Sequence, residues 1–118
     1  MLRKGVLLIN LGTPDSFNKE DVKKYLLQFL LDRNVINLPY IQRQLLVRGV
    51  IVPRRLKESS DNYRSIWMDD GSPLAVWTKK LTLGLSELLG KEYMVMYAMR
   101  YQNPSIESVL NEFKKNNI

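Results

Sequence analysis

Residues 5–16 read GVLLINLGTPDS, and this stretch decides the fold class. Its apolar part, residues 5–11, lies between a basic pair and the turn sequence at 12–14. A short apolar run with turn residues at its ends favours a buried parallel strand over a helix. The stretch contains neither GxGxxG nor GK[ST], so residues 10–16 predict a tight turn into a helix and not a nucleotide-binding loop. Because ligands in open α/β sheets gather at the carboxyl ends of strands, this turn should line any cleft.

The sequence after this turn has the period of an amphipathic helix. Five apolar residues recur at helical spacing, namely Val22, Tyr25, Leu26, Phe29 and Leu30. Asn18 is placed to cap this helix, with Asp21 at the third helical position. We therefore predict a helix of about three to four turns.

Further helices and a second strand are predicted downstream. Residues 59–68 are predicted to be helical, and the DDGSP sequence then makes a turn. Residues 77–89 have helical apolar spacing and end at Gly90, which suits a left-handed cap. Residues 93–99, YMVMYAM, read as a second apolar strand. The Asn-Pro dipeptide at 103–104 opens a last helix, whose apolar face is formed by Ile106, Val109, Leu110 and Phe113.

The segment between these elements, residues 35–57, has no sustained period. Pro39 and Pro53 interrupt it, and its apolar residues are mixed with arginines. We predict a long connection there, with a helical part around residues 41–47. Long connections inside compact domains are uncommon and are often functional.

The order strand, helix, long connection, helix, strand, helix predicts an α/β fold with a parallel sheet. The length of 118 residues suits one domain. Two strands alone do not make a stable doubly wound sheet, so these residues are expected to form part of a domain.

Cysteine and histidine are both absent from the chain. Their absence excludes a disulfide framework, a thiolate metal site and a cysteine nucleophile. It also excludes a histidine-based zinc site and a triad, so Ser72 has no base to activate it. The Ser72 hydroxyl can still donate a hydrogen bond to a ligand oxygen. We expect neither a catalytic residue nor a metal ligand in this segment.

The net charge is +6, and most of the excess lies in the middle of the chain. Between residues 33 and 64 the charged residues are Arg33, Arg43, Arg48, Arg54, Arg55, Lys57 and Arg64 against Glu58 and Asp61. Residues 48–57, RGVIVPRRLK, place this charge beside aliphatic side chains. Such a surface fits a nucleic acid, an anionic membrane, or a flat apolar molecule with carboxylates at its edge. Nucleic acid is the least favoured of the three, and the residues alone leave the other two open.

Two other features have ordinary structural explanations. Asp69-Asp70, before Gly-Ser-Pro, is typical of an exposed turn. The methionines Met94, Met96 and Met99 are interpreted as a core-facing stripe with the period of a strand. At the N-terminus, MLRKGVLLINLG has an apolar run too short for a signal peptide or a membrane span, so we expect a cytoplasmic protein.

Five stretches give the chain a resemblance to a known family. They are GVLLINLGTPDS at 5–16, VKKYLLQFLLDRNVINLP at 22–39, LLVRGVIVPRR at 45–55, YRSIWMDDGSPLAVWTKK at 63–80 and MRYQNPSIESVL at 99–110. Together they resemble the N-terminal part of the bacterial ferrochelatases, which insert ferrous iron into protoporphyrin IX to make protoheme. The resemblance implies two Rossmann-like α/β domains with a porphyrin cleft between them. Residues 1–118 would be the N-terminal part of the first domain, and the second domain would be absent.

The resemblance also implies which residues bind porphyrin. Residues 35–57 match the active-site lip of the family, which is apolar for porphyrin and membrane and basic for propionates. The matched porphyrin-binding positions are Arg55, Tyr63 and Ser72, with Arg54, Arg100 and Tyr101 matched less directly. Leu11 falls where some members have a methionine near the metal path, so that role is not carried over.

The family uses a histidine to remove pyrrole protons and acidic residues to deliver iron, and these lie downstream of the matched segment. The resemblance therefore implies a ferrochelatase parent, a lyase, with porphyrin recognition as the share of this segment and no iron insertion by the segment alone. The implied partners are protoporphyrin IX, ferrous iron through the missing part, and the surface of an anionic inner membrane. No cofactor is expected in this segment. The alternative is a non-enzymatic basic module that binds an anionic membrane through residues 41–57.

Overall fold

The computed structural model describes residues 3–118, so the first two residues of the basic N-terminus lie outside the described part. The chain forms two compact units. The sheet unit joins residues 3–13 to residues 73–118, and the helical unit comprises residues 14–72. The single domain that we expected from the length is therefore organised as two units, because residues 14–72 make most of their contacts among themselves.

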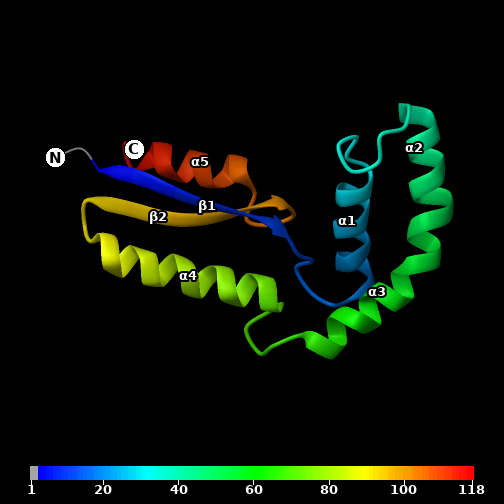
Figure 1. Cartoon of the computed structure of the whole chain (residues 1–118), viewed down its shortest axis with the longest axis horizontal. Coiled ribbons are helices and arrows are strands. Elements are labelled where there is room, and N and C mark those ends of the chain that lie inside the picture. The colour runs from blue at the N-terminus through cyan, green and yellow to red at the C-terminus, as the bar shows by residue number, and fades with distance from the viewer. Residues whose placement is uncertain (1–2) are drawn as a thin grey trace. The chain divides into compact units, whose positions relative to one another are not determined.

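The sheet unit is built on two parallel strands (Figure 1). Strand β1 (Lys4–Gly12) pairs with strand β2 (Tyr93–Tyr101) over their whole lengths. The register runs from Lys4 opposite Tyr93 to Gly12 opposite Tyr101. Both predicted strands and their parallel pairing are confirmed.

Two helices cover the sheet, one on each face (Figure 1). Helix α4 (Pro73–Leu89) ends before Gly90, whose φ of 79° is the left-handed conformation expected there. Helix α5 (Ile106–Lys115) begins after Ser105, whose side chain accepts a hydrogen bond from the Ser108 amide at 3.1 Å. This side-chain cap satisfies one of the amide groups that the first turn leaves unpaired.

The core of the sheet unit lies between β2 and α5. Ala98, Val109 and Phe113 are buried there. The side chains packed around them are Leu7, Met94, Met96, Ile106 and Ile118. The predicted methionine stripe is only partly right, because Met99 has the opposite parity along the strand and is buried on the other face. Leu110 was predicted to lie on the apolar face of α5, but it is 52% exposed.

The helical unit contains the largest difference between the predicted and the observed structure. After α1 (Lys19–Leu30), helix α2 (Tyr40–Leu46) passes into a π-helix, η1 (Val47–Ile51), and then into α3 (Val52–Ile66). Most of the predicted long connection is therefore helical. Pro53 does not end the run, because it follows directly on η1, whose wider π-helical turn interrupts the regular hydrogen-bond pattern at this point.

The start of α1 is capped differently from the prediction. Asn18 occupies the N-cap position, but its side chain makes no capping hydrogen bond. Instead, the Ser16 hydroxyl donates to Asp21 Oδ2 at 2.6 Å and accepts from the Asn18 amide at 3.1 Å. The carboxylate of Asp21 lies in the first turn, where the helix dipole stabilises negative charge.

Several aromatic rings of the helical unit pack against one another. Tyr63 makes edge-to-face contacts with Tyr25 and Trp67, with ring centres 6.3 and 6.4 Å apart. Trp67 in turn makes an edge-to-face contact with Phe17 at 5.8 Å. Such pairs add to the stability that burial alone provides.

Candidate functional site

The arginine pair of the resemblance lies in the first turn of α3. Arg54 and Arg55 are both exposed, and Pro53 separates them from the buried Val52. Adjacent residues on an α-helix project about 100° apart, so the two guanidinium groups face different directions.

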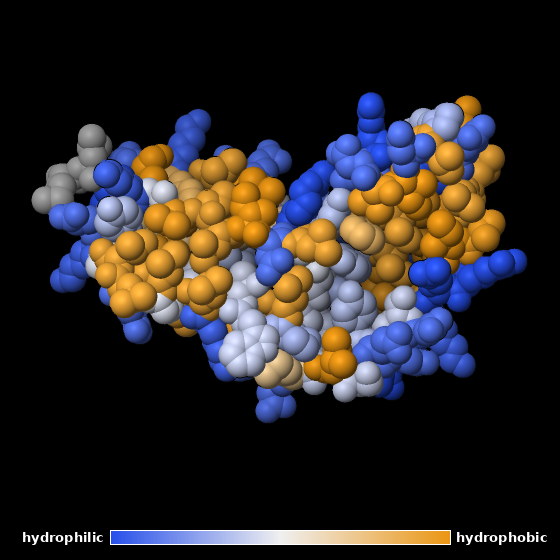
Figure 2. Space-filling view, in the orientation of Figure 1, coloured by the Kyte–Doolittle hydropathy of each residue, from blue (hydrophilic) through white to orange (hydrophobic). Residues whose placement is uncertain are grey.

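Exposed apolar side chains precede this pair. Tyr40, Ile41 and Leu45 on α2 are between 67% and 70% exposed. Val50 in η1 is 40% exposed. Figure 2 shows apolar surface gathered over the region of α1 and α2, with polar side chains along its border. The residues that match the family's lip thus form an exposed apolar helical surface, followed in the sequence by two exposed arginines.

Tyr63 is half-buried and packs against other aromatic rings of the helical unit. It lies eight residues after Arg55 on α3, about 12 Å along the helix axis. Burial raises the pKa of its hydroxyl, and a hydrogen bond with the Tyr25 side chain partly offsets that rise. Its ring position is fixed by Tyr25 and Trp67. Its role in porphyrin binding stays a prediction.

Ser72 closes the helical unit behind a tight turn. Met68 and Gly71 exchange backbone hydrogen bonds of 2.9 and 3.2 Å, and Gly71 has a φ of 131°. The DDGSP turn is therefore confirmed. Ser72 itself is 2% exposed, so its hydroxyl is held within the fold and does not lie on an open face. The hydrogen bond from the Ser72 hydroxyl to a ligand stays a prediction.

Arg100 and Tyr101 lie in the other unit, at the carboxyl end of β2. Arg100 is exposed, and its guanidinium carbon lies 4.9 Å from the centre of the buried Tyr101 ring. The parallel register brings Gly12, the end of β1, beside Tyr101. At the same end, Asn10 donates from Nδ2 to the Thr78 hydroxyl at 3.2 Å. Arg100 thus places an exposed cation at the carboxyl edge of the sheet, where α/β proteins bind ligands.

The six predicted residues are therefore not gathered in one place within a unit. Arg54, Arg55 and Tyr63 share helix α3, and Ser72 ends the same unit. The remaining pair, at positions 100–101, belongs to the sheet unit.

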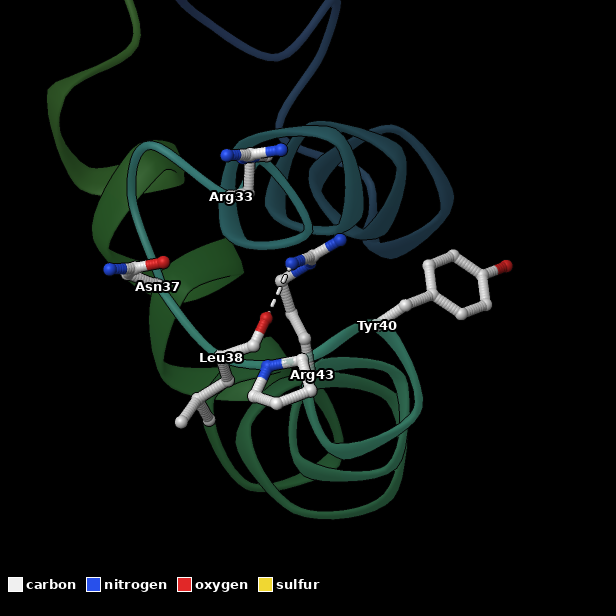
Figure 3. Close-up of a pocket in the computed structure, with 6 residues that line it drawn as sticks. Arg33, Asn37, Leu38, Tyr40 and Arg43 are labelled. Carbon is white, nitrogen blue, oxygen red and sulfur yellow. Dashed lines mark hydrogen bonds between the residues drawn. The ribbon is translucent and has the colours of Figure 1, made fainter.

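A second cationic feature was not predicted from the sequence. Arg33 and Arg43 both line a cavity of about 380 Å³, together with residues 37–40 (Figure 3). Arg43 Nη1 donates to the Leu38 carbonyl at 2.7 Å, while its buried Nε has no hydrogen-bond partner. An unpaired buried donor costs about 1–3 kcal/mol. The charge excess between residues 33 and 64 was the only sequence signal for this cavity, and it does not show that two arginines ten residues apart line the same cavity.

Two features of the described residues bear on iron and on membranes. Among residues 3–118, no three acidic side chains gather closely enough to hold a metal ion. No helix in the same range has the length and apolar character needed to cross a bilayer.

The comparisons with known proteins agree on one family. The ferrochelatase family model matches residues 3–118. The ferrochelatases of Bdellovibrio bacteriovorus and Legionella pneumophila are 46% and 45% identical to the chain over 98% and 96% of its length, and the match covers 34% of each relative. A coproporphyrin III ferrochelatase of Limosilactobacillus reuteri is 44% identical over 98% of the chain, which covers 37% of that protein.

The chain thus spans about a third of the length of the curated relatives that it matches. The matched region contains both strands and the lip helices described above. On a match of this extent, the chain belongs to the ferrochelatase family.

Proposed function

We propose that this chain supplies the porphyrin-binding lip and one cleft wall of a ferrochelatase, a lyase that inserts ferrous iron into protoporphyrin IX to form protoheme. The observation that carries the proposal is the exposed pair Arg54-Arg55, which follows an exposed apolar surface in a chain of this family. A porphyrin is a flat apolar disc with propionate groups at its edge. The lip offers apolar side chains for the disc and guanidinium groups for the propionates. Ferrous iron is a substrate in this proposal, and the segment is assigned no cofactor of its own.

The energetics assign different tasks to the two kinds of contact. Apolar burial contributes about 25 cal/mol for each Å² removed from water, so the disc supplies most of the affinity. An exposed arginine pair with a carboxylate contributes only about 0.2–1 kcal/mol. Once the porphyrin shields the bond from water, a charge-assisted hydrogen bond contributes about 1.5–3 kcal/mol. Arg55 therefore orients the disc, and its contribution to the binding free energy depends on how well the bound porphyrin shields the arginine–propionate bond from water.

The choice of porphyrin rests on the relatives. Two of the matched proteins are named ferrochelatase, and one is named coproporphyrin III ferrochelatase. We favour protoporphyrin IX as the substrate. Coproporphyrin III has additional propionates, so a preference for it would require more cationic partners around the disc than the lip pair alone.

A membrane role has an observation of its own. Tyr40, Ile41 and Leu45 project from α2 with about two thirds of their surface exposed. Apolar side chains beside arginines are typical of surfaces that dip into the headgroup region of anionic membranes. We propose peripheral contact of α2 with a membrane as an accompaniment of porphyrin binding. A purely membrane-binding, non-enzymatic module is the competing function.

The test is a titration of protoporphyrin IX into the chain while the fluorescence of Trp67 and Trp77 is followed. Arg55→Ala is expected to weaken a saturable site by about tenfold, which is about 1.4 kcal/mol. The matched control is Lys114→Ala, which removes one positive charge from an exposed side chain of α5, outside residues 35–57. The control is expected to keep the affinity of the unchanged chain.

Equal, non-saturating quenching in all three proteins would contradict the proposal that the lip recognises porphyrin. Binding to anionic vesicles that survives Arg55→Ala and ignores added porphyrin would favour the membrane module. Comparison of coproporphyrin III with protoporphyrin IX in the same titration ranks the two substrates.

A further inference from the structure

The two-arginine cavity, lined by Arg33, Arg43 and residues 37–40, has the features of an anion site. We propose that it binds a phosphate-type oxyanion, at a place separate from the porphyrin-binding arginines of α3. The positive charge comes from two guanidinium groups that line the same cavity. None of the described residues that line it is acidic. A ligand in the cavity therefore meets two cations and no acidic lining residue, while the carboxylate of Asp32, next to Arg33 in the sequence, accepts the Asn34 amide.

The hydrogen bonds of Arg43 leave one edge of its guanidinium group without an acceptor. Nη1 is used by the Leu38 carbonyl, which holds the group in place. Nε is buried and has no partner within the described chain. Nε and Nη2 form the side edge of the guanidinium fork, the edge that binds two oxygens of a phosphate or carboxylate at once. An oxyanion bound at this edge would supply the acceptor that Nε lacks.

The backbone around the cavity fixes the distance between the two arginines. After α1, the Val35 and Ile36 amides donate to the Asp32 carbonyl at 2.9 and 3.0 Å, which turns the chain back. The Asn34 amide donates to the Asp32 carboxylate at 2.9 Å and completes the turn. Helix α2 then begins at Tyr40 and carries Arg43. The site is thus built on a turn with defined hydrogen bonds.

The Tyr40 ring shapes the rim of the cavity. The guanidinium carbon of Arg43 lies 5.9 Å from the centre of this ring. Tyr40 itself is 67% exposed, and Ile41 beside it is 70% exposed. An oxyanion in the cavity would therefore lie next to an apolar surface. Two sources of the oxyanion fit this arrangement: the phosphate of a lipid headgroup, and a free phosphate.

The first experiment measures inorganic phosphate binding to the chain by calorimetry. A saturable site is expected, and Arg33→Gln and Arg43→Gln are each expected to weaken it by about tenfold, equivalent to about 1.4 kcal/mol. Arg48→Gln is the matched control, because Arg48 is an exposed arginine on the same helical run that does not line this cavity. Arg33 is also exposed, so Arg33→Gln tests the proposal even where Arg43→Gln unfolds the protein.

No saturable binding of phosphate, or an equal loss in all three variants, would overturn the proposal, because a general loss reflects net charge alone. A second measurement separates the two sources. Where Arg33→Gln weakens sedimentation with phosphatidylglycerol vesicles and inorganic phosphate competes with them, the source is a lipid headgroup. Where only inorganic phosphate binding depends on Arg33, the source is a free phosphate. Both results support the site, and neither depends on Arg55, so the porphyrin proposal is tested separately.

Discussion

Position 12 shows how a single residue fixes the carboxyl end of the sheet. Gly12 has a φ of 131°, and a Cβ added there would overlap the Tyr101 carbonyl oxygen. Gly12→Ala is therefore expected to lower the free energy of unfolding by at least about 1 kcal/mol. Gly84 on α4 is the control, because nothing lies within 4 Å of its added Cβ and its φ is ordinary. Gly84→Ala is expected to stabilise the protein by about 0.5–1 kcal/mol. Urea denaturation measures both, and two changes of the same sign would contradict this account.

The hydroxyl of Tyr63 links stability to alkaline pH. Its pKa is raised above the ordinary value of 10.0, mainly by burial. A raised pKa means that the folded state favours the neutral phenol, so this contribution is complete below the pKa of the unfolded chain and is lost as pH rises through the folded value. The free energy of unfolding of the wild type should thus fall more steeply than that of Tyr63→Phe above about pH 10. Denaturation of both proteins at several alkaline pH values compares the slopes, and parallel slopes would be the contrary result.

At the scale of elements, the sequence predicted helices and strands whose apolar residues keep one spacing, but it did not predict a helical run in which that spacing changes. Both strands, α1 and α4 were predicted because their apolar residues keep one spacing. Residues 40–66 were not recognised as one helical run because η1 inserts a π-helical turn between α2 and α3. A wider turn shifts every later side chain around the axis, so apolar residues on the two sides do not share a 3.6-residue period.

Helix α5 allows a direct comparison of a buried and an exposed apolar side chain. Phe113 is 6% exposed within the core of the sheet unit, while Leu110 on the same helix is 52% exposed. Phe113→Ala is expected to cost about 3 kcal/mol, because it leaves a cavity between α5 and β2. Leu110→Ala is expected to cost less than about 1 kcal/mol. Chemical denaturation measures both changes, and similar losses would show that α5 packs in another rotation.

At the scale of the whole molecule, the sequence indicated the chemistry of the site better than its geometry. The excess of arginine and the apolar lip were visible as composition, and both are found on the surface of the helical unit. The cavity of Arg33 and Arg43 depends on the turn after α1, whose hydrogen bonds are set by the backbone and not by a recognisable motif. Tyr63, matched to a porphyrin position, packs among aromatic rings because helix α3 turns it toward α1.

The composition of the chain also limits what it can do with a bound porphyrin. Iron insertion releases two pyrrole protons, and a base that works near neutral pH is most often histidine, which this chain lacks. We therefore expect the purified chain to bind protoporphyrin IX and yet insert ferrous iron no faster than a protein-free blank. Loss of the free porphyrin absorbance under anaerobic conditions measures the rate, and Arg55→Ala serves as the control for porphyrin that is merely adsorbed. A rate above the blank that Arg55→Ala abolishes would place a proton acceptor within these 118 residues. The division between porphyrin recognition here and chemistry elsewhere would then be wrong.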